Sequence, residues 1–271
     1  MQMPHYETLA VSLDEAVALV ELNRPDKANS MNAAMWREIG DCMRWCDAER
    51  GVRAVVLAGR GRHFCAGIDL EMFASLDDPT LEPGRRAERR RDTIERLQAD
   101  LTAIERCRKP VLAAVHAACI GGGGDMISAC DMRYCTEDAY FAIKEIELGM
   151  VADVGTLQRL PRLIGDGLMR ELAYTGRRMD AQEAHRYGLV NRVHADREGL
   201  LADVLALART IARRSPLAIR GTKEVLLHAR EHGVAAGLRY VANWNAGMLS
   251  ADDLLRSVGA GGKPETVVFD D

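Results

Sequence analysis

The chain has 271 residues, of which 48% are hydrophobic and 28% are charged, and its formal net charge is -4. This composition is ordinary for a globular protein, and the net charge gives no support to nucleic-acid binding, so we expect no nucleic-acid partner. The length allows one large domain, or one domain with a helical appendage, and a substantial core.

The first part of the chain predicts two strands, a helix and a third strand. Residues 6–22 form two strand patterns around a turn at 14–15. Apolar residues then recur at helical spacing over 32–46, with Asn32 as the N-cap. A short apolar strand follows at 53–58.

A similar pattern follows in the middle of the chain. Residues 94–104 show an apolar helix face, and 111–115 form an uninterrupted apolar run that is typical of a buried strand. Further short strands are predicted at 132–135 and 140–143. Because short strands alternate with helices, we expect an α/β core with helical layers around its strands.

Strand signals stop near Glu198. From there the apolar spacing is helical, with a break at Pro216. The sequence therefore predicts an α/β core over 1–197 and a helical region over 198–271.

Cysteine usage and the absence of targeting signals indicate where in the cell the protein is expected. The seven cysteines lie mostly in apolar stretches, as buried free thiols do in a reducing environment. No window approaches the roughly 18 apolar residues of a membrane span. The beginning of the chain has no basic-then-apolar leader, and 267–271 is no peroxisomal address. We therefore expect no membrane association and a cytoplasmic location.

Two glycine-bearing turns follow predicted strands. One spans 63–70, and the other spans 119–125 and includes four consecutive glycines at 121–124. Glycines let the backbone approach a ligand and aim several N–H groups into one concavity, which suits a developing oxyanion. A tight turn made only for packing is the alternative. A dinucleotide fingerprint is excluded because Met126 stands where glycine or alanine is needed.

Three carboxylates follow, Asp125, Glu145 and Asp153, of which Asp125 and Asp153 stand in apolar surroundings. If these sites are dry, desolvation and mutual repulsion raise the pKa of the carboxyl groups, so that one can act as an acid while another stays a base. The alternative is structural: Asp125 as a helix N-cap, and Asp153 as a cap of a helix that begins near Gly155. The residues alone leave both interpretations open.

Segments 23–32, 64–70 and 120–126 together resemble the crotonase (enoyl-CoA hydratase/isomerase) superfamily in order and spacing. The resemblance continues through 176–184 and 188–190, so it covers nearly the whole chain. It implies a spiral α/β core of strand-strand-helix units and a helical C-terminal region that trimerises. The expected assembly is a homotrimer or a homohexamer.

The same resemblance implies an acyl-CoA substrate and a site for it. The oxyanion hole would consist of the backbone N–H groups of Ile68 and Gly122, which hold the thioester oxygen as an enolate forms. We expect no metal and no separate cofactor, because coenzyme A is part of the substrate. The residues expected along coenzyme A and the acyl group are Lys27, Ala28, Ala66, Gly67, Asp69, Leu70 and Gly121.

Within the superfamily the chain is most similar to the Δ3,5-Δ2,4-dienoyl-CoA isomerases of fatty acid β-oxidation, through segments 119–135 and 144–161. That resemblance implies Asp153 as the base at C2, Glu145 as the proton donor at C6, with the two labels exchangeable, and Asp125 as a supporting acid. Hydratases are similar but carry Glu at the place of Asp125 and have no acid at the place of Asp153.

Two other functions stay open as alternatives. One is an enoyl-CoA hydratase, and the other is a non-catalytic homologue that binds coenzyme A or RNA. RNA binding would need a basic face such as the arginine-rich run at 85–91, which we interpret instead as a solvated helix face. We interpret His116 as a core residue bonded to the backbone, and Trp36 as a core or interface residue.

Overall fold

The computed structural model of the chain describes residues 3–72, 80–261 and 267–271, so 1–2, 73–79 and 262–266 of the two predicted regions lie outside the described residues. The strands are β1 (Leu9–Asp14), β2 (Val17–Leu22), β3 (Ala54–Gly59), β4 (Val111–Val115), β5 (Ala118–Ile120), β6 (Met132–Thr136), β7 (Tyr140–Ala142), β8 (Met179–Asp180) and β9 (Arg192–His194). The helices are α1 (Ala33–Ala48), α3 (Pro83–Arg106), α4 (Gly122–Ser128), α5 (Thr156–Arg159), α6 (Pro161–Ile164), α7 (Asp166–Thr175), α8 (Ala181–Arg186), α9 (Arg197–Ala212), α10 (Pro216–His232), α11 (Val234–Met248) and α12 (Ala251–Gly259). Short 3-10 turns are η1 (Pro25–Lys27), η2 (Leu70–Met72) and η3 (Glu145–Leu148).

The strands form two sheets. The larger has the order β1-β2-β3-β4-β6-β9, and it is parallel except for the β1–β2 pair; the smaller has the order β5-β7-β8. The β1–β2 hairpin turns through Glu15 and Ala16, both with positive φ, as a tight hairpin connection requires. The strands predicted at the start and middle of the chain are confirmed. The short strands β5, β8 and β9 were not predicted.

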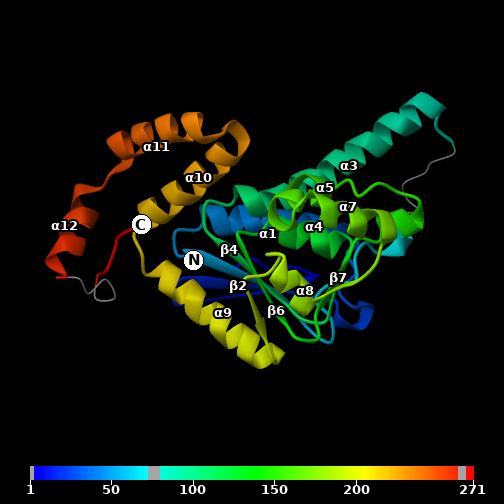
Figure 1. Cartoon of the computed structure of the whole chain (residues 1–271), viewed down its shortest axis with the longest axis horizontal. Coiled ribbons are helices and arrows are strands. Elements are labelled where there is room, and N and C mark those ends of the chain that lie inside the picture. The colour runs from blue at the N-terminus through cyan, green and yellow to red at the C-terminus, as the bar shows by residue number, and fades with distance from the viewer. Residues whose placement is uncertain (1–2, 73–79, 262–266) are drawn as a thin grey trace.

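Helices cover both faces of the larger sheet (Figure 1). Alternate residues of β3 show the division: Val55 and Leu57 pack into the core that includes α1, while Val56 packs into the core that includes α9. Helix α1 begins where predicted, because the Asn32 side chain accepts a hydrogen bond of 2.9 Å from the Met35 N–H.

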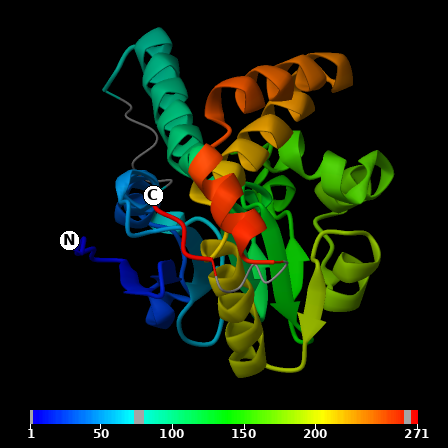
Figure 2. The same ribbon diagram turned by 90° about the vertical axis from the view of Figure 1, so that its left-hand side faces the viewer.

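After β9, the described residues form no further strand, and the region from α9 onward is helical as expected. Helix α9 packs on the sheet, whereas α10 to α12 extend from the body as an arc (Figures 1 and 2). A division at residue 197 stays a prediction. The later helices carry exposed apolar side chains, among them Leu226, Val234, Leu238, Leu249, Leu255 and Val258.

Several minor expectations are confirmed. All seven cysteines are buried and free. The arginine-rich run lies on the exposed first turns of α3, and the His116 ring contacts the Gly61 carbonyl at 3.0 Å. Among the described residues, no helix has the length and apolar character needed to cross a membrane.

Candidate active site

A cavity of about 740 Å³ opens between the two glycine-bearing turns, helix α3 and turn η3. Most of its wall is apolar, from residues such as Trp36, Ile94, Leu97, Met150 and Val154. Nine of the predicted site residues line this one cavity: Ala66, Gly67, Ile68, Leu70, Gly121, Gly122, Asp125, Glu145 and Asp153.

Three predicted residues lie beside the cavity without lining it. Ala28 runs along the first glycine turn, where its carbonyl accepts a hydrogen bond of 3.0 Å from the Ala66 N–H. Lys27 is exposed at the end of η1. The Asp69 carboxylate forms an ion pair with Arg24 at 2.9 Å, which lowers the pKa of Asp69. Asp69 therefore acts here as a partner of Arg24.

The two glycine turns are bound to each other. The Ile120 N–H donates to the Cys65 carbonyl at 3.0 Å, and the Cys65 N–H donates to the Ala118 carbonyl at the same distance. Within the described part of the chain, neither the Ile68 N–H nor the Gly122 N–H has a hydrogen-bond acceptor. Both residues line the cavity. Unpaired backbone donors at a cavity wall are available to a ligand oxygen.

Close contacts explain three of the four consecutive glycines, Gly121, Gly122 and Gly123. A Cβ at Gly122 would lie 3.0 Å from the Met31 sulfur, and one at Gly123 would lie 3.0 Å from the Cys65 Cβ. Gly121 has φ +50° and ψ -116°, and a Cβ there would lie 3.0 Å from Glu145 Oε1. Packing and access to the cavity therefore require glycine at the same turn.

Asp125 is buried on α4, and it is 2% exposed. Its Oδ1 accepts a hydrogen bond of 2.7 Å from the Thr156 N–H, at the start of α5. The N-cap of α4 itself is Gly121. Burial raises the pKa of Asp125, although the bonds from Thr156 oppose this shift. Asp125 therefore caps α5, a helix that is distant from it in sequence. This hydrogen bond joins α4 to the segment that carries Asp153.

Glu145 begins η3 and has few polar contacts in the site. Its Oε2 is buried, and no donor among the described residues reaches it. Burial raises the pKa of Glu145 to about 7, and the negative charges of Asp125 and Asp153 add to the effect. A carboxyl group with that pKa can hold a proton near neutral pH and release it.

Asp153 lies in the loop before α5. Burial raises the pKa of its carboxyl group, and its backbone carbonyl accepts a hydrogen bond of 2.6 Å from the Gln98 side chain on α3. The N-cap of α5 is Gly155, and the first turn of that helix is capped by Asp125. The cap interpretation of Asp153 is therefore wrong, and Asp153 lines the cavity.

The sequence interpretation missed one whole wall of the cavity. Ile94 and Leu97 belong to the apolar face of α3, which the sequence shows without indicating what it faces. Trp36 is a core residue as expected, since it is 2% exposed and its Nε1–H donates to the Met31 carbonyl at 3.1 Å. It also lines the cavity.

Comparison with known proteins places this arrangement in a family. The family model for enoyl-CoA hydratase/isomerase matches residues 12–255. The chain belongs to the enoyl-CoA hydratase/isomerase family. Among solved structures, an enoyl-CoA hydratase from Bacillus anthracis superposes with a TM-score of 0.87 at 30% identity, covering 97% of this chain and 99% of that one. The expected crotonase-type α/β fold is thereby confirmed.

Two curated relatives in this family are more similar in sequence. The mitochondrial Delta(3,5)-Delta(2,4)-dienoyl-CoA isomerase of Homo sapiens is 49% identical over 94% of this chain and 79% of that protein. The peroxisomal Delta(3,5)-Delta(2,4)-dienoyl-CoA isomerase of Arabidopsis thaliana is 45% identical over 96% of both.

These relatives also correct one expectation. The cytoplasmic location predicted above is contradicted, because the relatives are named as mitochondrial and peroxisomal proteins. The prediction had rested on the lack of address signals. Such signals are read by receptors and are separate from the residues that build the fold, so the residues of a shared fold carry no compartment information.

Proposed function

We propose that this chain is a Δ3,5-Δ2,4-dienoyl-CoA isomerase of fatty acid β-oxidation. The observation that carries the proposal is the meeting of three carboxylates and two unpaired backbone donors in one apolar cavity. The names of the human and Arabidopsis relatives support the same activity.

The reaction moves a proton across a conjugated chain. The Ile68 and Gly122 N–H groups bind the thioester oxygen, and Asp153 removes the proton from C2. The C2–H electrons form the C2=C3 bond, the C3=C4 pair becomes C4=C5, and the C5=C6 pair takes a proton from Glu145 at C6. A 2,4-dienoyl thioester results. Asp153 is left protonated and Glu145 ionised, so exchange with solvent restores both.

The raised pKa values suit this division of labour. Glu145, with a pKa of about 7, carries a proton in a substantial fraction of molecules at neutral pH. Asp125 is already bonded to the Thr156 N–H, so we assign it a supporting role that keeps the Asp153 segment in place. The apolar wall excludes water that could add to the conjugated intermediate.

Substrate binding follows from the positions beside the cavity. Coenzyme A would run along the Lys27–Ala28 loop and the segment 66–70, with the Lys27 ammonium near a phosphate. The chemistry we propose uses backbone donors and carboxylates of the chain itself. Coenzyme A enters as part of the substrate.

An ultraviolet assay with two substrates tests the proposal. Purified protein is mixed with a 3,5-dienoyl-CoA and, separately, with crotonyl-CoA. We expect the absorbance of a conjugated 2,4-dienoyl thioester to appear with the first, and Asp153→Asn to lower kcat by about a hundred- to ten-thousandfold. Brisk hydration of crotonyl-CoA without any dienoyl conversion would instead identify a hydratase.

We also propose that the helical region 198–271 joins copies of the chain into a homotrimer or a homohexamer. The exposed apolar side chains on α10 to α12 support this assembly, because such a face is unfavourable in water. Light scattering should give a mass of three or six chains. Leu255→Asp should lower that mass, whereas Ser257→Asp, which adds the same charge on the same helix, should change it less.

A further inference from the structure

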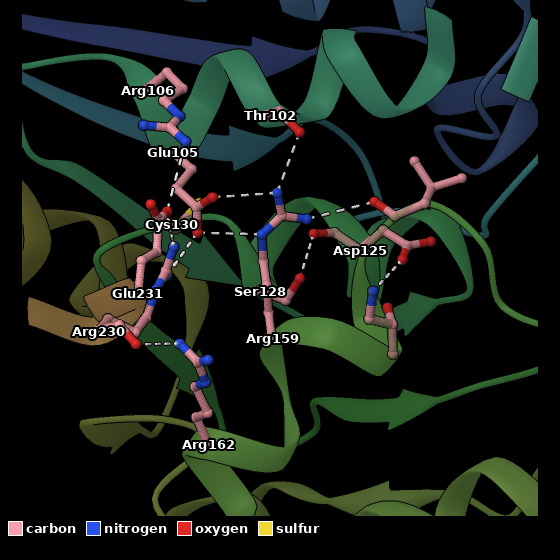
Figure 3. A network of polar contacts seen from close by, with 12 residues as sticks. Thr102, Glu105, Arg106, Asp125, Ser128, Cys130, Arg159, Arg162, Arg230 and Glu231 are labelled. Atoms are coloured by element: carbon pink, nitrogen blue, oxygen red, sulfur yellow. Dashed lines mark hydrogen bonds and ion pairs between the residues drawn. The ribbon is translucent and has the colours of Figure 1, made fainter. Parts of the chain in front are cut away.

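Asp153 lies on the boundary between two cavities. The second cavity has a volume of about 640 Å³, and it also borders Asp153, Val154 and Gly155. Its wall is charged, in contrast to the apolar substrate cavity, and includes Arg159 and Glu105. Figure 3 shows the polar contacts of this second wall. None of the roles assigned so far uses this charged cluster.

The guanidinium of Arg159 joins the Asp153 loop to helix α3. Its Nη1 donates to the Val154 carbonyl at 3.4 Å, its Nη2 donates to Thr102 Oγ1 at 3.2 Å, and its Nε donates to Glu105 Oε1 at 3.2 Å. Thr102 and Glu105 belong to α3. A planar guanidinium can hold these partners at once because its donors point in fixed directions.

Gly155 makes this approach possible. Its φ is +130°, and a Cβ at this position would overlap Arg159 Nη1. The guanidinium therefore occupies the space where any other residue would place its side chain. The Arg159 guanidinium can pack against the loop because residue 155 has no Cβ.

Glu105, which also binds Arg230, holds the Arg159 side chain in place. Glu105 is 8% exposed, and it also accepts a hydrogen bond of 2.7 Å from Arg230 Nη1 on α10. Burial raises the pKa of Glu105, but the bonds from Arg230 and Arg159 outweigh it and lower the pKa below its usual value. Glu105 is therefore ionised at neutral pH, and the arginine keeps its charged partner.

We propose that Arg159 is a positioning residue for the isomerase, which holds the Asp153–Thr156 loop against α3 so that the Asp153 carboxylate stays aimed at the substrate. This inference rests on the proposed function. The loop has two duties there, since it carries the base and offers the Thr156 N–H to Asp125. Arg159 does not line the substrate cavity, so its effect passes through the loop. Through Arg230, the same cluster connects the C-terminal helices to the active site.

The test uses the full-length chain with Arg159→Met and, as a matched control, Arg162→Met. Arg162 lines the same charged cavity, but it donates to the Arg230 carbonyl at 3.2 Å and forms no hydrogen bond or ion pair with the described residues of the loop. Three quantities are measured: kcat and KM for a 3,5-dienoyl-CoA, and the hydrogen-exchange rate of the Thr156 amide.

For Arg159→Met we expect kcat to fall about ten- to a hundredfold, as displacement of a catalytic group by about 1 Å does. We expect KM to change little and the Thr156 amide to exchange faster. Arg162→Met should resemble the wild type in all three. Arg159→Lys keeps the charge but lacks the planar set of guanidinium donors. Its kcat and its Thr156 exchange rate should therefore lie between those of the wild type and Arg159→Met. If Arg159→Met does not fold, Arg159→Lys decides the question.

Two results would overturn the proposal. One is an equal kcat in Arg159→Met and Arg162→Met. The other is a lowered kcat with unchanged protection of the Thr156 amide, which would mean that Arg159 does not act through the loop. If the wild type fails to convert dienoyl-CoA at all, the proposed function fails, and the exchange rates still decide whether Arg159 holds this loop.

Discussion

Two glutamates that line adjoining cavities have pKa values that are shifted in opposite directions. Glu105 is buried in the charged cavity, and Arg159 and Arg230 lower its pKa despite that burial. Glu145 lines the apolar cavity, where its Oε2 has no donor among the described residues and its pKa is raised to about 7. Burial acts in the same direction on both, so the partners decide which one stays ionised.

The difference separates residues that stabilise the fold from residues that serve chemistry. A carboxylate between two arginines contributes to stability but cannot exchange protons near neutral pH. A carboxyl group without a charged partner destabilises the fold, but it is able to give and take a proton near neutral pH. Four predictions, made with three substitutions at or beside these two residues, test the contrast.

The largest effect is expected from Glu145→Gln on activity. The amide keeps the shape of the side chain but cannot supply the proton at C6, so kcat for 3,5-dienoyl-CoA should fall about a hundred- to ten-thousandfold. Glu147→Gln is the control. Glu147 also lines the cavity but is exposed and paired with Lys144, so its substitution should leave kcat close to wild type. Equal activity in the two variants would remove Glu145 from the mechanism.

Glu105→Gln should act mainly on stability. It leaves Arg159 without a charged partner in a largely buried place and leaves Arg230 with Glu231 alone, at 3.7 Å, so the free energy of unfolding in urea should fall by about 3 kcal/mol. The matched control on the same helix is Glu95→Gln. Glu95 forms a solvent-exposed ion pair with Arg91. The loss of this pair should change the free energy of unfolding by about 0.5 kcal/mol or less. Similar losses in both would show that the charged cavity adds no more than a surface pair.

The contrast also explains which features the sequence could reveal. The glycine run at 121–124 gives a local signal, and so do Asp125 and Asp153, because these charged residues stand among apolar neighbours; Glu145 follows the segment 141–144. The α/β fold follows from patterns of the same local kind. The sequence therefore predicts these parts of the candidate site without knowledge of long-range contacts.

Long-range contacts account for most of what was missed. Arg159 lies 54 positions from Glu105 in the chain, and Arg230 lies 125 positions from it, so no spacing rule joins them. Strand β9 has three residues and exists through its pairing with β6. The cap that Asp125 provides to α5 is equally invisible, since a sequence pattern suggests a cap only for the adjacent helix.

A smaller effect is expected on how the stability of Glu145→Gln depends on pH. The pKa of Glu145 rises from 4.5 to about 7 on folding, so between these values the folded state binds more protons than the unfolded state, and wild-type stability falls as the pH rises. Glutamine removes this dependence. In urea unfolding, the variant should match the wild type near pH 4 and exceed it by about 2 kcal/mol at pH 6. A constant difference between the two proteins would show that the Glu145 carboxyl group does not have a raised pKa.

The smallest effect concerns the glycine that faces Glu145. In Gly121→Ala, a methyl group in a strained backbone conformation meets Glu145 Oε1 at 3.0 Å and pushes the carboxyl group from its place. Gly149→Ala is the matched control, because Gly149 also has positive φ, at +70°, but nothing lies within 4 Å of its added Cβ. Both variants should lose about 1 kcal/mol of stability from backbone strain. Only Gly121→Ala should also lose activity, with kcat for 3,5-dienoyl-CoA about tenfold lower, because only there does the new methyl group displace the proton donor. A comparable loss of kcat in Gly149→Ala would mean that strain near η3, and not contact with Glu145, limits the reaction.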